Sequence, residues 1–225
     1  MRRQDAQDIV HCCRRLAEAG LIAGQDGNVC VRQGTDRALA TPAGLIKGDL
    51  SVDDLVEIDL QGKRIRGHRR PSSEIDMHLR ILRARPDVGA VVHAHPPVAT
   101  GFSVAGEAFD ACVLPELIFQ VGWVPLVPYG TPGTAELGEQ LEPFIKDYDA
   151  LLLANHGAVT MGATLTDARI RMESMEHAAK ILLTARLLGR VVELDKSAVA
   201  RLEELRRARR GPGPYPGCPT PGTET

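Results

Sequence analysis

The chain has 225 residues, of which 44% are hydrophobic and 25% charged, and its formal net charge is −2. This composition excludes a disordered or collagen-like chain, and the near-neutral charge provides no basic field for a nucleic-acid backbone or an anionic membrane. One domain is the default at this length, because a single core grows to about 250 residues before chains divide. We therefore expect a globular protein whose partners include neither nucleic acid nor membrane.

The cysteines and the apolar runs bear on the cellular compartment. The five cysteines form no CxxC pair and no zinc-finger spacing, so we expect them to be reduced thiols. Charged residues interrupt the first twenty positions, so we expect no signal peptide, and no later apolar run approaches the roughly 18 residues that span a bilayer. These features favour a cytoplasmic location.

The first part of the chain predicts a helix followed by hairpins. Ile9, Cys12 and Leu16 recur at helical spacing and Gly20 follows, which predicts a helix over residues 4–19. Strands are predicted over residues 29–32, 38–41, 55–60 and 63–66, the last two joined by a turn.

The remainder of the chain alternates helices and strands irregularly. Ser72 or Ser73 can cap a helix that runs to residue 84, and Met172 and Met175 are interpreted as core residues of a long helix. Further helices are predicted over residues 135–145, 166–188 and 196–209, and further strands over residues 88–95, 123–127 and 150–154. This order favours an α/β fold with a mixed sheet covered by helices.

The end of the chain has a different composition. Residues 211–225 contain nine glycines and prolines and almost no apolar side chains. Such a segment cannot bury enough apolar surface to fold, so we expect a disordered tail after a single domain over residues 1–210.

Three of the seven histidines are candidate metal ligands. His93 and His95 lie two residues apart on a predicted strand, so both rings face the same way and can reach one cation. His156 follows another strand at a Gly-containing turn, and strand ends are where sites gather. The pair alone is a weak signal, because strand alternation also produces it by chance. The other four histidines, set aside as ligands, are His11, His68, His78 and His177.

Glu74 is the leading carboxylate near these histidines. It starts the helix before the His93 strand, where it can complete a metal shell or act as a base. By itself it also fits an ordinary acidic residue in the first turn of a helix. Both interpretations stay open from the residue pattern.

Several short segments supply groups that hold phosphate. The turn over residues 24–28, the Thr-Pro-Ala-Gly run over residues 41–44, and Ser72 with Ser73 offer backbone N–H groups and hydroxyls. Each segment taken separately also fits an ordinary turn or cap.

Taken in order, the segments resemble the class II aldolases, with the fuculose-phosphate aldolases as the nearest branch and adducin head domains as distant members. The resemblance covers about residues 9–188. It is carried by Gly27-Asn28-Val29, Thr41-Pro42-Ala43-Gly44, Pro71-Ser72-Ser73-Glu74, His78, Val91-Val92-His93-Ala94-His95-Pro96, Pro128-Tyr129-Gly130 with Pro132-Gly133-Thr134, and Asn155-His156-Gly157.

The resemblance implies a three-layer α/β/α sandwich with a largely antiparallel mixed central sheet, assembled as a homotetramer with sites between subunits. It implies Zn²⁺, or another divalent metal such as Mn²⁺ or Co²⁺, on His93, His95 and His156. Glu74 would be the fourth ligand at rest and the catalytic acid or base once substrate displaces it. The residues implied to bind the substrate phosphate are Gly27, Asn28, Ala43, Gly44, Ser72 and Ser73.

The resemblance further implies a metal-dependent aldolase that cleaves a phosphorylated ketose, such as L-fuculose 1-phosphate, into dihydroxyacetone phosphate and an aldehyde. The alternatives on the same scaffold are a metal-dependent decarboxylase, a pentulose-5-phosphate 4-epimerase and a methylthioribulose-1-phosphate dehydratase. A non-enzymatic adducin-like module is disfavoured, because the three histidines and Glu74 are all present.

The chain departs from the family pattern at three places. Cys30 stands where the family usually has serine, and Ala43 stands where it has threonine, so fewer hydroxyls are available for a phosphate. Residues 113–117 lack the tyrosine that serves as proton donor in bacterial fuculose-phosphate aldolases, and Tyr215 in the tail is a weak substitute.

Overall fold

The structure is a computed structural model that describes residues 3–109 and 112–210. The predicted tail over residues 211–225, including Tyr215, lies outside the described residues, and the division into one domain and a tail stays a prediction. Within the described residues, no helix combines the length and the apolar character needed to cross a membrane.

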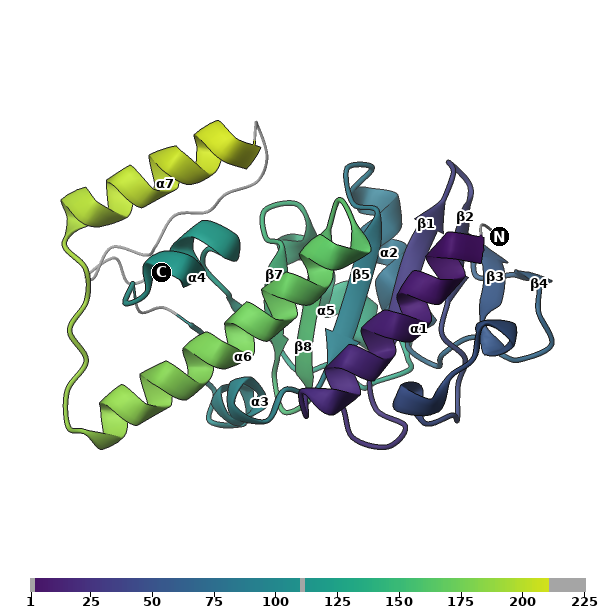
Figure 1. Cartoon of the computed structure of the whole chain (residues 1–225), viewed down its shortest axis with the longest axis horizontal. Coiled ribbons are helices and arrows are strands. Elements are labelled where there is room, and N and C mark those ends of the chain that lie inside the picture. The colour runs from purple at the N-terminus through teal and green to yellow at the C-terminus, as the bar shows by residue number, and fades with distance from the viewer. Residues whose placement is uncertain (1–2, 110–111, 211–225) are drawn as a thin grey trace.

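A single mixed sheet forms the centre of the molecule (Figure 1). In the described part of the chain it has eight strands in the order β4-β3-β2-β1-β5-β8-β7-β6, with β6 and β7 parallel and all other neighbours antiparallel. The strands are β1 (Asn28–Gln33), β2 (Arg37–Ala40), β3 (Val56–Asp59), β4 (Arg64–Arg66), β5 (Ala90–Ala94), β6 (Leu126–Val127), β7 (Ala150–Leu153) and β8 (Gly157–Gly162).

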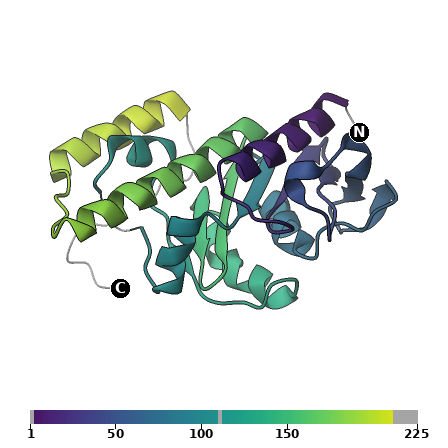
Figure 2. The ribbon, with the colours of Figure 1, turned by 60° about the horizontal axis from the view of Figure 1, so that its bottom comes forward.

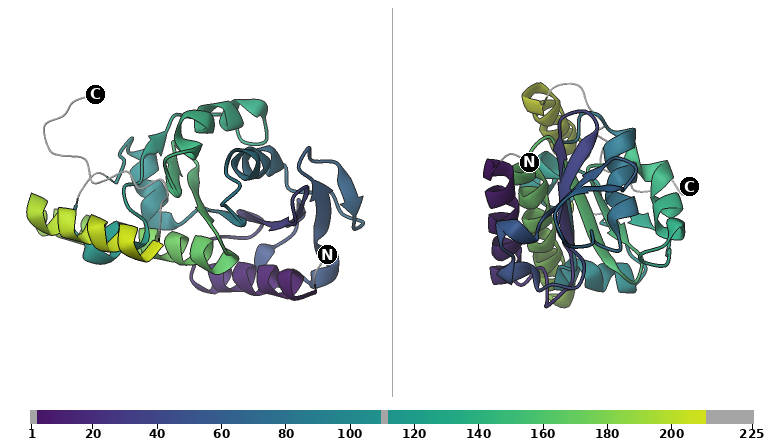
Figure 3. Two further views of the ribbon diagram at one scale, coloured as in Figure 1. Left: turned by 90° about the horizontal axis from the view of Figure 1, so that it is seen from above. Right: turned by 90° about the vertical axis from the view of Figure 1, so that its right-hand side faces the viewer.

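Helices cover both faces of the sheet, which makes the α/β/α sandwich that the family resemblance implied (Figure 3). Helices α1 (Arg3–Glu18) and α6 (Leu165–Leu187) lie on one face, while α2 (Ile75–Ala84) and α5 (Ala135–Ile145) lie on the other. Helix α4 (Pro115–Gln120) contacts both α6 and α7 (Lys196–Arg210), and Figure 2 shows α4 between them.

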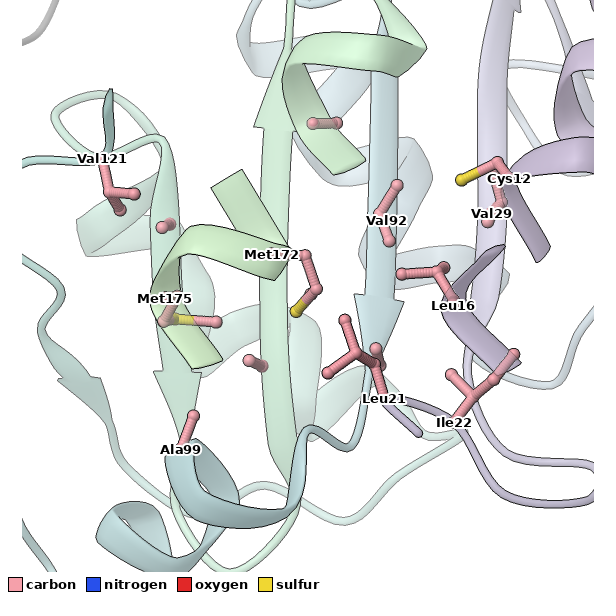
Figure 4. Packing of buried hydrophobic residues seen from close by; sticks show 14 of the residues in the cluster. Cys12, Leu16, Leu21, Ile22, Val29, Val92, Ala99, Val121, Met172 and Met175 are labelled. Atoms are coloured by element: carbon pink, nitrogen blue, oxygen red, sulfur yellow. The ribbon is translucent and has the colours of Figure 1, made fainter. Parts of the chain in front are cut away.

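Each face of the sheet has its own hydrophobic core. Under α1 and α6, residues such as Leu16, Val92, Met172 and Met175 are buried together (Figure 4), which confirms that the two methionines are core residues. The opposite core joins α2 and α5 to the other face of the sheet. The central strand β5 is buried along its whole length, because it is covered on both faces.

Local sequence signals account for most helix ends. Thr164 and Asp167 form a reciprocal capping box at the start of α6, and Gly189 takes a positive φ of 101° just after its end. The start of α2 differs from the prediction, because Glu74 occupies the cap position and neither serine caps the helix. Instead, the hydroxyl of Ser72 accepts a hydrogen bond from the Glu74 N–H.

Some elements were not predicted from the sequence. Strand β8, helix α3 (Pro97–Val104) and α4 are absent from the sequence prediction, and β6 is shorter than the predicted strand over residues 123–127. Strand β8 begins and ends with glycine, so its sequence shows no clear alternation of apolar and polar residues. It forms because it pairs with both β5 and β7.

The expectation of five reduced thiols is wrong at Cys112. That residue is disulfide-bonded in the structure, and the three free cysteines among the described residues are Cys12, Cys13 and Cys30. Burial raises the pKa of all three free thiols, to about 12 for Cys13 and Cys30, and so disfavours the reactive thiolate.

Candidate metal centre and substrate pocket

The three candidate histidines meet at one end of the sheet. His93 lies on β5, where it is paired with Asn28 of β1 on one side and Val159 of β8 on the other. His95 follows two residues later, just beyond the strand. His156 lies in the turn that joins β7 to β8, and β8 runs antiparallel to β5, so this turn reaches the end of β5 that carries the histidine pair.

Their ring nitrogens converge with the Glu74 carboxylate. Nε2 of His93 lies 3.1 Å from Nε2 of His95 and 3.4 Å from Oε2 of Glu74. Nε2 of His156 lies 3.1 Å from the other carboxylate oxygen, Oε1. The three rings thus surround one point, with their centroids 4.8 to 5.0 Å apart.

This donor set fits a divalent cation. Tetrahedral Zn²⁺ with bonds near 2.0 to 2.1 Å holds its ligand atoms about 3.4 Å apart. The three distances given above are close to this value, and the three histidine ligand nitrogens all lie within 4.8 Å of one another. The Nδ1–H of His93 donates to the carbonyl of Ala158 at 2.9 Å, so its Nε2 carries a lone pair. A lone pair that faces a carboxylate oxygen is repulsive unless a cation lies between them.

Neighbouring groups orient two of the rings. The Ala158 carbonyl orients the His93 ring through the hydrogen bond described above. The Asp26 carboxylate orients the His95 ring, with one oxygen 3.5 Å from Nδ1. Metal-binding histidines commonly use their second nitrogen in this way, which fixes the tautomer and the direction of the ring.

Burial keeps the imidazoles in the form that binds metal. It lowers the pKa of His93 to about 3, and burial together with the nearby His156 ring lowers the pKa of His95. Both rings are therefore neutral at pH 7 before any ion binds, as coordination requires.

The Glu74 carboxylate is held by a chain of hydrogen bonds. Burial alone would raise its pKa, but the His93 ring once it is protonated, together with hydrogen bonds from His156 and Asn28, brings the pKa well below its ordinary value. Nδ2 of Asn28 donates to Oε2 of Glu74 at 2.8 Å, and Nε2 of His78 donates to Oδ1 of the same amide. His78 is buried, and through this bond it positions the Asn28 amide.

Two glycines permit this close packing. A Cβ on Gly157 would lie 2.6 Å from both the Ala94 carbonyl oxygen and the His95 ring. Gly27 has a φ of +71°, and a Cβ there would lie 2.9 Å from the His93 carbonyl oxygen. Side chains at these two positions would push apart the strands that carry the histidines.

A cavity of about 290 Å³ opens beside the histidines. It is lined by all six residues that the resemblance implied for phosphate, together with Glu74, His95 and His156. Those six are Gly27, Asn28, Ala43, Gly44, Ser72 and Ser73.

The six candidates differ in what they can offer a phosphate. The Ala43 N–H already donates to the Arg70 carbonyl, and the Asn28 amide is bonded on both sides. The N–H groups of Gly44 and Ser73 donate to no other described residue, so they remain available to a ligand. A phosphate contact at each position stays a prediction.

Three residues of this region were not singled out as site residues in the sequence. His78 was set aside as a ligand. The other two residues, Asp26 and Lys47, line the cavity. Lys47 had one available signal, since it is a lone basic residue three positions after the Thr-Pro-Ala-Gly run. Nothing local marks Asp26, because its proximity to His95 arises only when the turn packs against the end of β5.

Comparisons with known proteins show what this chain resembles. The family model described as "Class II Aldolase and Adducin N-terminal domain" matches residues 7–183. The L-fuculose phosphate aldolase of Methanocaldococcus jannaschii is 35% identical over 181 residues, which are 80% of this chain and 96% of that protein. The 3-oxo-tetronate 4-phosphate decarboxylase of Pectobacterium atrosepticum is 38% identical over 169 residues, 73% of this chain and 77% of that protein.

A solved structure shares the architecture as well. An L-fuculose 1-phosphate aldolase superposes with a TM-score of 0.84 at 29% identity, covering 91% of this chain and 97% of that one. The matched segment contains every residue of the cavity, and the family model spans most of the chain. The chain therefore belongs to the class II aldolase and adducin family.

Proposed function

We propose that the protein is a metal-dependent lyase that cleaves a phosphorylated ketose, such as L-fuculose 1-phosphate, into dihydroxyacetone phosphate and an aldehyde. The observation that carries this proposal is the convergence of three Nε2 atoms and one carboxylate beside a cavity with free N–H donors. Family membership and the L-fuculose phosphate aldolase relative support the reaction type and the substrate class.

His93, His95 and His156 would hold the metal, with Glu74 as the fourth ligand before substrate binds. When bound, a divalent cation supplies positive charge beside the ketose oxygens, where negative charge develops as the carbon–carbon bond breaks. Three protein nitrogens leave room for substrate oxygens, which is typical of catalytic zinc sites.

Glu74 moves the proton in this proposal. Its carboxylate is ionised at neutral pH, so it can accept a proton from the substrate hydroxyl next to the bond that breaks. Asn28 and His78 hold the carboxylate in place during this transfer. The same carboxyl group can then return the proton to the carbon of the departing ketone fragment.

A decarboxylase is the second candidate, and the Pectobacterium atrosepticum relative favours it. Loss of CO₂ from a 3-oxo acid leaves the same kind of negative charge beside a carbonyl oxygen, so the same donor set suits both reactions. The two differ in the fragment released, which is an aldehyde in one case and CO₂ in the other.

The test combines metal analysis with a substrate panel. Purified protein is expected to contain about one divalent ion per chain and to release an aldehyde from at least one ketose phosphate. The His93→Ala variant is expected to lose both the ion and the turnover. Absence of metal together with unchanged turnover in this variant would refute the proposal.

The same panel separates the alternatives. Release of CO₂ without aldehyde supports the decarboxylase. A change of stereochemistry with no fragment released would indicate a 4-epimerase, and loss of water would indicate a dehydratase. A well-folded, metal-free and inactive protein would support an adducin-like module instead.

A further inference from the structure

Lys47 is a buried cation in the wall of the candidate substrate cavity. The residue is only 3% exposed, and its Nζ donates hydrogen bonds to the carbonyl oxygens of Gln25 at 2.8 Å and Leu45 at 2.9 Å. An ammonium group has three N–H donors, so one remains after these two bonds. The cavity it lines also contains Ser72 and Ser73.

The charge of Lys47 is not matched by an ion pair. Among the described residues, no carboxylate lies within ion-pair distance of its Nζ, although Asp26 and Glu74 act on it from farther away. Burial lowers the pKa of Lys47, and the nearby Cys13, Asp26 and Glu74 only partly oppose the shift. A buried cation that lacks a counter-ion is costly, so an anion bound beside it would be favoured.

The donors around the cavity suit a tetrahedral dianion. Gly44 and Ser73 provide N–H groups that bond to no other described residue, and the Ser73 hydroxyl likewise makes no bond to a described residue. Ala43 provides neither a hydroxyl nor a free N–H at this wall. These other donors are neutral. Among the described residues that line the cavity, Lys47 is therefore the basic residue that can offset the negative charge of a dianion.

We propose that Lys47 contacts the substrate phosphate and supplies the positive charge that makes this cavity selective for phosphorylated ketoses. This inference rests on the proposed function for the identity of the substrate, but the anion subsite itself does not depend on turnover. A charge-assisted hydrogen bond at a buried site corresponds to roughly tenfold to a hundredfold in affinity.

Lys47 also fastens the turn over residues 24–28, because its backbone N–H donates to Gly24 and its Nζ donates to Gln25. A purely structural role would act through this turn and not through charge. The Lys47→Gln variant separates the two roles, since an amide keeps two N–H donors but carries no charge.

The experiment titrates inorganic phosphate into metal-loaded protein by calorimetry. Wild type is expected to bind phosphate, and Lys47→Gln is expected to bind it at least tenfold more weakly with an unchanged metal content. Lys47→Met, which also removes both hydrogen bonds, is expected to be weaker still. The matched control is Lys63→Met, which neutralises an exposed lysine in the turn between β3 and β4 and is expected to match wild type.

Turnover adds an independent measurement. Lys47→Gln is expected to raise KM for a phosphorylated ketose about tenfold or more, while the rate with the unphosphorylated sugar falls much less. Equal losses with both sugars would indicate a displaced turn and would overturn the inference, as would phosphate affinity equal to wild type in Lys47→Gln. Failure of wild type to bind phosphate would overturn it as well.

These outcomes are distinguishable from failure of the proposed function. If no ketose phosphate is cleaved but phosphate binding still depends on Lys47, the proposed reaction fails and the anion subsite stands. If ketose phosphates are cleaved and Lys47→Gln behaves as wild type, the reaction stands and this inference fails.

Discussion

At the scale of single residues, the site depends on a chain of buried polar side chains, each in contact with the next. His78 bonds to Asn28, Asn28 bonds to Glu74, and Glu74 faces the histidine rings. Buried polar groups bonded to one another in this way favour one geometry, because a displacement breaks bonds that water cannot replace. Replacing one of these residues should therefore change the position of the side chain to which it is bonded.

His78 gives the protein a defined sensitivity to acid. Burial lowers its pKa from 6.5 to about 4, so between these values the unfolded chain binds a proton that the folded chain does not. The contribution of neutral His78 to the free energy of unfolding is therefore fully present above pH 6.5. It falls by about 3 kcal/mol as the pH decreases toward 4. Urea unfolding across this range should show that loss in wild type and a correspondingly smaller one in His78→Gln. Parallel stability profiles for the two proteins would contradict the prediction.

Asp26 should influence how tightly the metal is held. Its carboxylate faces Nδ1 of His95, and loss of such a partner commonly weakens metal binding about tenfold to a hundredfold. We expect Asp26→Asn to show this loss in a competition between the protein and a chelator for Zn²⁺. Asp53→Asn, which changes an exposed carboxylate elsewhere, is the control and should match wild type. Equal zinc affinities in all three proteins would exclude a role for Asp26.

At the scale of elements, α3 depends on a residue from another helix. This helix follows the metal-binding segment directly and has no side-chain cap of its own. Glu176 of α6 accepts hydrogen bonds from the N–H groups of Val98 and Ala99, and its side chain is only 2% exposed. The carboxylate thus performs the capping role at a helix N-terminus, where negative charge is favoured.

We expect Glu176→Ala to destabilise the protein by about 3 kcal/mol, because it leaves two N–H groups unsatisfied beside the core. Glu173→Ala on the same helix removes only a partly exposed pair with Arg169 and should cost less than about 0.5 kcal/mol. Chemical denaturation of both variants measures the difference. If the two losses are equal, Glu176 does not cap α3.

At the scale of the whole molecule, the metal site is built on a sheet that is stabilised elsewhere. Cores on both faces of the sheet are formed by residues other than the four candidate ligands. The strand pairing of β5 with β1 and β8 fixes where His93 lies before any ion binds. The fold should therefore not require the metal.

Chelation provides the test of this independence. Removal of the metal should abolish turnover and lower the thermal midpoint, since an ion present at 100 times its Kd contributes about 2.7 kcal/mol. The far-ultraviolet circular dichroism at 25 °C should stay the same, and added Zn²⁺ should restore the midpoint. Collapse of the dichroism signal on chelation would show that the site is needed for folding.

The assembly state is a separate expectation at this scale. The family resemblance implies a homotetramer with sites between subunits, and we expect sedimentation velocity to give a single species of four chains. Dilution of such an assembly should lower turnover per chain if a neighbouring subunit completes the site. A monomer with full activity would contradict both statements.

The parts of this protein that the sequence predicted are those encoded locally. The helix over residues 135–145 was predicted with the bounds that α5 has, because its apolar spacing and its ends are local features. The two-residue spacing of His93 and His95 likewise placed both rings on one side of a strand. The place of His156 at the end of another strand made it the third candidate, and the order of the motifs then indicated the family and its fold.

Contacts between distant segments were decided only by the tertiary structure. Strand β8 is stabilised by its two neighbours and not by its own pattern, while Glu74, Asn28 and His78 come together from positions up to 50 residues apart. Lys47 gains its burial because separate turns close around it. Local preferences follow from each residue and its near neighbours, whereas burial, pKa and hydrogen-bond partners depend on segments that meet only when the chain has folded.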